Sequence, residues 1–264
     1  QMSEEEKEIL KMKVQQMIEK VKQQEGENYS DRLKNLNETS YKCDKCKDMT
    51  FLLLEDGTAK ECECRALRIA EEKLKISGVS EEFRQMRFEN FSYERSVETI
   101  DAYLKAKSYS KNFSEIRAAR QNSIMFLGQV GSGKTHLSMA IANSLLDKSI
   151  GVIYMPFRDS ITKIKQSITD EVNYNKEMEL YKNAQVLLID DLFKGSVTTA
   201  DINAMFSIIN YRYMKKLPII VSSEKNINEL LAIDEAIASR LIETSKGFVI
   251  EFKGKHLNYR LEGA

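Results

Sequence analysis

The sequence has no net charge, no long apolar run and only two histidines. Its 40 basic side chains balance its 40 acidic ones, which gives no argument for a strongly basic, nucleic-acid-binding surface. No segment approaches the length of a membrane span, and the acidic residues 4–6 are not followed by the apolar core of a secretory signal. His136 and His256 are too few and too far apart for a metal cluster. We therefore expect a cytoplasmic protein without a membrane partner.

Cysteine is also scarce, and its four residues lie in one short stretch. Cys43 and Cys46 form a Cys-x₂-Cys pair, and Cys62 and Cys64 form a Cys-x-Cys pair about fifteen residues later. Disulfides are rare in the cytoplasm, whereas this spacing is similar to that of a zinc ribbon. We expect a structural Zn²⁺ with four protein ligands, which leaves no open position for catalysis. Unpaired thiols are the alternative.

A glycine-rich segment dominates the middle of the chain. Residues 123–135 (SIMFLGQVGSGKT) join an apolar strand to the pattern G-x-x-x-x-G-K-T. The glycines allow backbone conformations that a Cβ would block, so the loop N–H groups can turn toward an anion. Lys134 supplies charge for the β- and γ-phosphates, Thr135 offers a hydroxyl to Mg²⁺, and the following helix presents its positive end. We expect ATP or ADP to bind here; the predicted ligands are Gly128, Gly131, Ser132, Gly133, Lys134, Thr135 and His136. A Gly/Ser-rich turn that matches by chance is the alternative.

A second strand ends in two carboxylates. Residues 185–193 read QVLLIDDLF, and paired carboxylates repel each other unless a cation lies nearby. Mg²⁺ bound to ATP is such a cation. We expect Asp190 to bind Mg²⁺ together with Thr135, and Asp191 to orient or deprotonate the attacking water. A solvated strand end is the alternative.

Strand and helix patterns alternate from the first apolar strand onward. Short β-branched runs separated by helices predict parallel strands that are buried on both faces. The expected fold class is α/β, a P-loop NTPase with a parallel sheet and the nucleotide at the carboxyl ends of the strands. After the first strand, we expect strands at residues 151–155, 186–189, 218–221 and 248–252, and helices at 97–120 and from about residues 159, 200 and 227.

The N-terminal part has a different organisation. Residues 3–24 carry apolar side chains at spacings of four, three and four, which predicts an amphipathic helix with a narrow stripe for a partner helix or for the chain's own next domain. Apolar residues 51–54 and the turn Asp56-Gly57 predict a small hairpin between the cysteine pairs, and a helix is expected from Arg65 to about Lys75. The predicted domains are 1–75 (helix and four-cysteine zinc module), 76–95 (linker) and 96–264 (ATPase).

These motifs resemble those of AAA+ ATPases, and within them the DnaC/DnaI-type replicative helicase loaders of bacteria and phages. The resemblance rests on GQVGSGKTH, LLIDDLF, IIVSS, ASRLIE and the CDKC…CEC segment followed by SGVSEEF and FENF, and it covers nearly the whole chain. It implies ATP hydrolysis, binding of a hexameric DnaB-type helicase through the N-terminal part, weak and local contact with single-stranded DNA, and self-association through the AAA+ domain.

The resemblance also implies roles for two arginines. Arg240 in ASRLIE would be an arginine finger that reaches the γ-phosphate bound to a neighbouring subunit, and Arg260 in LNYRL would be the second sensor. For Arg240, the alternative is a surface ion pair with an acid such as Asp234 or Glu235.

One position departs from the family pattern. Loaders usually have Asn as the first sensor after the strand LPIIV, whereas this chain reads Ser222, Ser223 and Glu224. An ionised acid cannot donate to the γ-phosphate and repels it. Either a neighbouring serine takes this role, or hydrolysis is slow and nucleotide binding does most of the switching.

Two other functions share part of this pattern. A transposition-regulating AAA+ ATPase that coats duplex DNA would leave the cysteine module unexplained. A P-loop kinase of a small metabolite would leave the Asp190–Asp191 pair and ASRLIE unexplained. We therefore favour the helicase loader.

Overall fold

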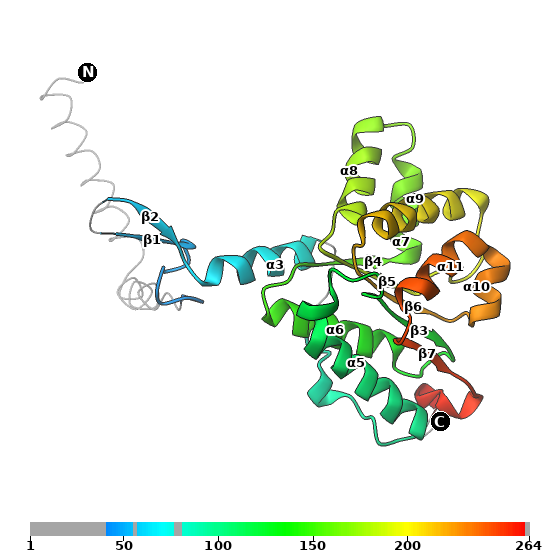
Figure 1. The fold of residues 1–264 in the computed structure, drawn as a ribbon. Helices are drawn as coiled ribbons and strands as arrows, with labels where there is room; N and C mark the ends of the chain where they lie inside the picture. Colours follow the sequence, from blue (N-terminus) through cyan, green and yellow to red (C-terminus); the bar gives the residue numbers. More distant parts are fainter. Residues whose placement is uncertain (1–40, 55–56, 77–80, 262–264) are drawn as a thin grey trace, which may run out of the picture. The chain divides into compact units, whose positions relative to one another are not determined.

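The structure is a computed structural model that describes residues 41–54, 57–76 and 81–261 (Figure 1). The predicted helix at residues 3–24 lies outside these ranges. The chain divides into two compact units, residues 1–62 and 63–264, whereas the three domain ranges expected from the sequence stay a prediction. Among the described helices, none is long and apolar enough to cross a membrane.

The first unit contains the predicted hairpin. Strands β1 (Phe51–Leu53) and β2 (Ala59–Glu61) pair antiparallel, with Phe51 opposite Glu61. Gly57 lies between them with φ of +80°, a conformation that glycine adopts without steric cost. The hairpin expected between the two cysteine pairs is confirmed.

The second unit contains a five-stranded sheet in which all neighbours are parallel. Its order is β4-β5-β6-β3-β7. The strands are β3 (Ile124–Gly128), β4 (Val152–Pro156), β5 (Val186–Asp190), β6 (Ile219–Ser223) and β7 (Val249–Phe252). Because β6 lies between β3 and β5, residues at the end of β6 lie between the glycine-rich loop and the Asp190–Asp191 pair.

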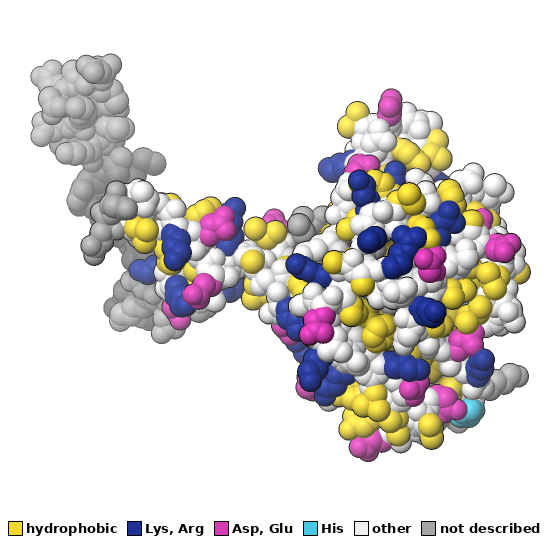
Figure 2. Space-filling view, viewed as in Figure 1, with side chains coloured by type: hydrophobic (Ala, Val, Ile, Leu, Met, Phe, Trp, Pro, Cys, Tyr) yellow, Lys and Arg dark blue, Asp and Glu magenta, His cyan; other side chains and the backbone are white. Residues whose placement is uncertain are grey.

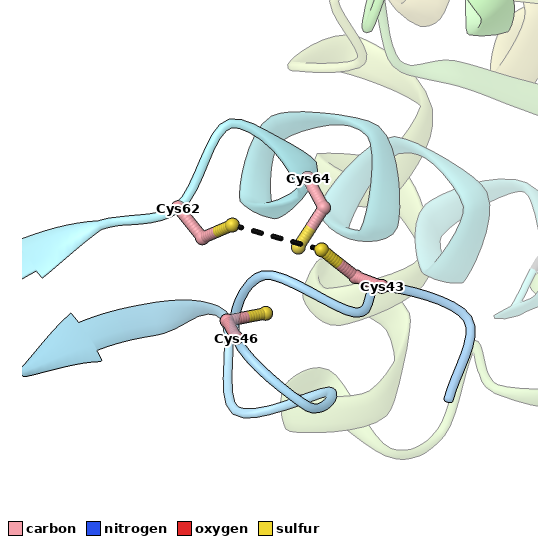
Figure 3. A group of neighbouring side chains, drawn as sticks. All are labelled: Cys43, Cys46, Cys62 and Cys64. Atoms are coloured by element: carbon pink, nitrogen blue, oxygen red, sulfur yellow. Dashed lines mark hydrogen bonds between the residues drawn. The ribbon is translucent and has the colours of Figure 1, made fainter. Parts of the chain in front are cut away.

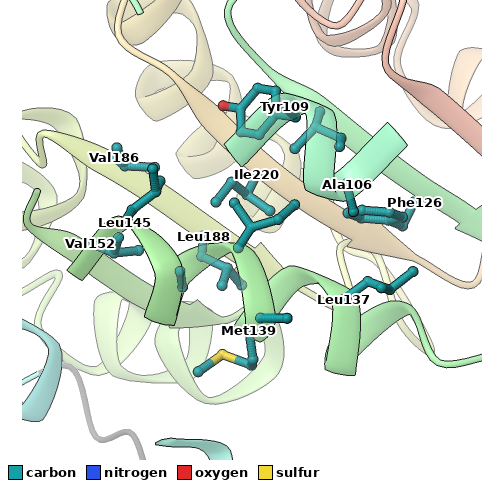
Figure 4. Close-up of a cluster of buried hydrophobic side chains, with 14 of the residues drawn as sticks. Ala106, Tyr109, Phe126, Leu137, Met139, Leu145, Val152, Val186, Leu188 and Ile220 are labelled. Atoms are coloured by element: carbon teal, nitrogen blue, oxygen red, sulfur yellow. The ribbon is translucent and has the colours of Figure 1, made fainter. Parts of the chain in front are cut away.

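Both faces of this sheet are buried. Along β3, Ile124 and Phe126 belong to one apolar cluster, and Met125 and Leu127 belong to the other. Helices α5 (Val97–Ile116) and α6 (Lys134–Asp147) cover the first face (Figure 4). The second is covered by α7 (Phe157–Gln166), α8 (Glu171–Lys182), α9 (Thr199–Lys215), α10 (Ile227–Ile233) and α11 (Glu235–Thr244). The predicted α/β class with a parallel sheet is confirmed.

Most of the predicted helices begin within a few residues of the expected position. Side-chain caps explain several starts: Ser96 accepts from the Thr99 N–H before α5, and Thr198 accepts from the Asp201 N–H before α9. Helix α8 was not predicted, because its sequence EVNYNKEMELYK has little apolar periodicity. The remaining described helices are α3 (Cys64–Ile76), α4 (Glu81–Arg84), η1 (Phe88–Asn90), η2 (Lys255–Leu257) and η3 (Tyr259–Leu261).

A buried arginine connects α8 to the sheet through hydrogen bonds. Arg212 on α9 is fully buried, and its guanidinium donates to the carbonyl oxygens of Tyr181, Lys182, Ala184 and Pro218 at 2.7–3.0 Å. These carbonyls lie at the end of α8 and before β5 and β6. The arginine therefore satisfies backbone acceptors that would otherwise be buried without a partner.

Replacing Gly128 should destabilise the sheet more than replacing a glycine with the same backbone conformation. Gly128 has φ of +96°, and a Cβ there would collide with the Phe252 carbonyl oxygen, which accepts from the Gln129 N–H. Gly247 has φ of +94°, but a Cβ there would meet nothing within 4 Å. We expect Gly247→Ala to lower the free energy of unfolding by about 1–2 kcal/mol, and Gly128→Ala to lower it further. Urea denaturation measures both, and equal losses would contradict this packing.

Candidate nucleotide and metal sites

The predicted nucleotide residues meet at a cavity of about 400 Å³ in the second unit. It lies at the carboxyl ends of β3, β5 and β6, as expected for an open α/β sheet. Of the predicted residues, those that line it are Gly131, Gly133, Lys134, Thr135, His136, Asp190, Asp191 and Arg260. Two that do not line it belong to the same loop: Gly128 ends β3, and the Ser132 hydroxyl donates to the Gln129 carbonyl oxygen at 2.8 Å.

Lys134 forms hydrogen bonds to the backbone of the glycine-rich loop. Lys134 Nζ donates to the carbonyl oxygens of Gly128 and Gln129, at 2.8 and 2.6 Å. Burial lowers the pKa of Lys134 to about 8, although the neighbouring carboxylates, Asp191 first among them, act in the opposite direction. At neutral pH the ammonium is therefore charged, and it is positioned beside the loop that would receive phosphates.

Asp190 is a buried carboxylate surrounded by hydroxyl groups. It accepts from Thr135 Oγ1 at 3.0 Å, from the Tyr154 hydroxyl at 3.2 Å and from Ser222 Oγ. Burial raises the pKa of Asp190, whereas the hydrogen bonds from Ser222 and Thr135 lower it. Carboxylate and hydroxyl oxygens are suitable ligands for Mg²⁺. The predicted pair, Thr135 and Asp190, is in direct contact and fits that ion.

Asp191 is ion-paired with a lysine that the sequence analysis did not single out. Lys194 Nζ lies 2.6 Å from Asp191 Oδ2 and 2.9 Å from Glu224 Oε1, and all three residues line the cavity. The repulsion that Glu224 was expected to cause is therefore offset by a neighbouring cation. No sequence motif marks Lys194, because its pairing with Glu224 depends on β5 and β6 being neighbours.

The two serines of β6 are both engaged by protein groups. Ser222 Oγ donates to Asp190 and accepts from the Asp191 N–H at 2.9 Å. Ser223 Oγ donates to the Leu192 carbonyl oxygen at 2.7 Å, and both side chains are fully buried. Glu224, rather than a serine, is therefore the residue from this segment that lines the cavity.

Arg260 and His136 contact the glycine-rich loop or its surroundings. Arg260 lies in η3, which is joined to the loop by a hydrogen bond from the Tyr259 N–H to the Gly131 carbonyl oxygen at 3.3 Å. The His136 ring lies 2.9 Å (Nε2) from the Arg87 carbonyl oxygen and contacts the Phe91 ring. Both residues line the cavity, and their contact with a nucleotide stays a prediction.

Arg240 lies on α11, outside the cavity. Its guanidinium donates to the Ala236 carbonyl oxygen at 2.7 Å and to Asn210 Oδ1 at 3.1 Å, and it lies over the rings of Phe206 and Tyr213. Asp234 instead caps α11 by accepting from the Ile237 N–H at 2.7 Å. The structure does not bring Arg240 to the phosphate loop of its own chain, and its predicted action on a neighbouring subunit stays a prediction.

The four cysteine side chains point toward one another (Figure 3). Their Sγ atoms all lie within 4.8 Å of one another, and Cys43 Sγ and Cys62 Sγ are 3.8 Å apart. A tetrahedral Zn²⁺ with Zn–S distances of about 2.3 Å separates its sulfurs by about 3.8 Å. Backbone turns with positive φ at Lys47 and Asp48 follow the first pair. The cluster fits the structural zinc ion expected from the spacing.

With this geometry established, comparison with known proteins decides the family. Residues 84–251 match the bacterial DnaA ATPase domain. The chain belongs to this DnaA ATPase domain family. Over 97% of its length it is also 35% identical to the phage-like element PBSX protein XkdC of Bacillus subtilis (strain 168), of which it covers 99%. The expected resemblance to AAA+ ATPases that act in replication is therefore confirmed.

Solved structures share the fold of this DnaA-family domain. The DnaC helicase loader matches with a TM-score of 0.53 and 22% identity, over 66% of this chain and 100% of that one. AMPPCP-bound DnaA from Aquifex aeolicus matches with a TM-score of 0.54 and 24% identity, over 64% of this chain and 50% of that one. The chain thus spans half the length of the solved DnaA, and the resemblance to DnaC-type loaders holds for the fold.

The cysteine cluster predicts bound zinc that depends on each thiol. Cys46→Ser in the full chain should reduce the zinc content from about one ion per chain to near zero, because three thiolates and a hydroxyl bind Zn²⁺ far more weakly. Met49→Ser, at an exposed neighbouring position, should keep the metal. Elemental analysis of the purified proteins measures this, and full zinc occupancy in Cys46→Ser would refute the site.

The surroundings of Asp190 predict a magnesium-dependent contribution to ATP binding. Asp190→Asn keeps the volume but removes the charge, so we expect at least a tenfold loss of ATP affinity with Mg²⁺ and little loss in EDTA. Tyr154→Phe, which removes one hydrogen bond to Asp190 and keeps its carboxylate, should retain the dependence on Mg²⁺. Calorimetric titration with and without EDTA distinguishes these cases; an Asp190→Asn variant that still responds to Mg²⁺ would rule out this ligand.

Proposed function

We propose that the chain is an ATP-regulated loader of a hexameric DnaB-type replicative helicase. The observation that carries the proposal is the cavity where Lys134, the Thr135–Asp190 pair and Asp191 meet in a DnaA-family ATPase domain. A solved DnaC helicase loader has the same fold, which is compatible with this function. Such a protein acts in the cytoplasm, in the initiation of replication.

The residues of the cavity have different roles in binding and hydrolysing ATP. The loop N–H groups and Lys134 bind the phosphates, Thr135 and Asp190 hold Mg²⁺, and Arg260 and His136 contact the nucleotide. Mg²⁺, when bound with ATP, neutralises phosphate charge. Asp191 orients or deprotonates the attacking water. Its ion pair with Lys194 occupies the carboxylate that would contact the water, so slow hydrolysis is expected until that contact loosens.

The N-terminal residues and Arg240 serve helicase binding and self-association. Residues 1–75, with structural zinc held by Cys43, Cys46, Cys62 and Cys64, bind the helicase; residues 76–95 connect them to the ATPase domain at 96–264. Arg240 completes the nucleotide site of a neighbouring copy. Contact with single-stranded DNA is weak and local, in keeping with acidic and basic side chains that lie interspersed on the visible face (Figure 2).

The mass of the complex formed with a helicase tests this function. Candidate DnaB-type helicases include that of Bacillus subtilis, the organism of the 35% identical relative. We expect a helicase complex whose formation depends on ATP. Lys134→Ala should abolish that dependence, whereas Lys105→Ala, at a half-exposed position on α5, should keep it.

Two results would overturn the proposal. One is the absence of any complex with the helicase in the presence of ATP. The other is tight, length-dependent binding to duplex DNA without a helicase, which would favour the transposition-regulating ATPase.

A further inference from the structure

Lys194 is held between two carboxylates at the wall of the phosphate cavity. Its ammonium contacts Asp191 at 2.6 Å and Glu224 at 2.9 Å. The three side chains remain partly open to solvent, with exposed fractions of 43% for Lys194, 30% for Asp191 and 27% for Glu224. A ligand that enters the cavity can therefore reach this ammonium.

The backbone around Lys194 is fixed in an uncommon conformation. Asp191 and Phe193, on the N-terminal side of it, have φ of +56° and +58°, a region that side chains other than glycine rarely occupy. Phe193 is fully buried and packs edge-on against the Phe157 ring, with the ring centroids 5.5 Å apart. Burial of Phe193 thus anchors the loop that carries Lys194 at the cavity wall.

The charges at this wall act on the lysine of the glycine-rich loop. Burial has the largest effect on the pKa of Lys134 and lowers it; the charges of Asp191 and Glu224 raise it, and the Lys194 charge lowers it. Both ammonium groups line the same cavity, so a phosphate chain bound there lies between residues of the glycine-rich loop and the loop that carries Lys194. A γ-phosphate that approached Glu224 without an accompanying cation would be repelled.

We propose that Lys194 binds the γ-phosphate of ATP, oriented by Glu224, and thereby replaces the neutral first sensor of related ATPases. This inference rests on the proposed function as an ATP-binding protein. An ammonium that donates to the γ-phosphate distinguishes ATP from ADP, because only ATP carries that group. The Lys194–Glu224 pair therefore sets the preference of the cavity for the triphosphate.

Affinities for ATP and ADP, measured by calorimetry with Mg²⁺ on the full chain, test the role of Lys194. Lys194→Met should weaken ATP binding at least tenfold and change ADP binding less than twofold. The control is Lys105→Met, since Lys105 has a similar exposed fraction, 39%, and is ion-paired with Asp101 at 2.9 Å. It should change neither affinity.

A double variant distinguishes a direct contact of Lys194 with the γ-phosphate from a role in which Lys194 only neutralises the charge of Glu224. Lys194→Met with Glu224→Gln removes one positive and one negative charge, so the net charge of the cavity is unchanged. If Lys194 binds the γ-phosphate, the double variant keeps the weakened ATP affinity of Lys194→Met. Recovery of wild-type ATP affinity would overturn the inference, as would equal losses for ATP and ADP in the single variant.

The result that would refute the proposed function differs from the one that would refute the role of Lys194. Wild-type protein that binds neither nucleotide would refute the ATP site as a whole. Wild-type protein that binds both, with a Lys194→Met variant that behaves like wild type, would refute only the role of Lys194.

Discussion

One buried carboxylate, that of Asp190, joins four elements at the carboxyl edge of the sheet. It ends β5 and accepts hydrogen bonds from Thr135 on α6, Tyr154 on β4 and Ser222 on β6. An ionised carboxylate buried without partners would cost several kcal/mol, and these hydroxyls offset part of that cost. The phosphate loop, the candidate Mg²⁺ ligands and the segment after β6 are thereby held in one arrangement.

The rest of the cavity is organised by charge balance. Next to Asp190, a second acid at Asp191 and a third at Glu224 would repel one another and any incoming phosphate. Lys194 contacts both of these acids, and Lys134, the first residue of α6, lines the same cavity. A phosphate in the cavity would compete with these carboxylates for the ammonium groups, and this competition is the contact change that the proposed nucleotide-dependent switching requires.

The sequence predicted the parts of the structure that depend on local patterns. The β-branched strands, the glycine-rich loop and the Thr135–Asp190 contact follow from periodicity and from motifs with fixed spacing. Helix α8 could not be predicted, because its polar sequence is held by tertiary contacts, including the hydrogen bonds of Arg212. Lys194 and Ser222 gain their partners from the order of the strands, which no local pattern specifies. The contact of Arg240 with aromatic rings likewise depends on how α9 and α11 pack.

The proposed function depends on the cavity being a site for Mg²⁺ and ATP. Calorimetric titration of the full chain with ATP in the presence of Mg²⁺ tests this most directly. We predict saturable binding of one ATP per chain that is lost in Lys134→Ala. The absence of binding at millimolar ATP, or unchanged binding in Lys134→Ala, would contradict the account.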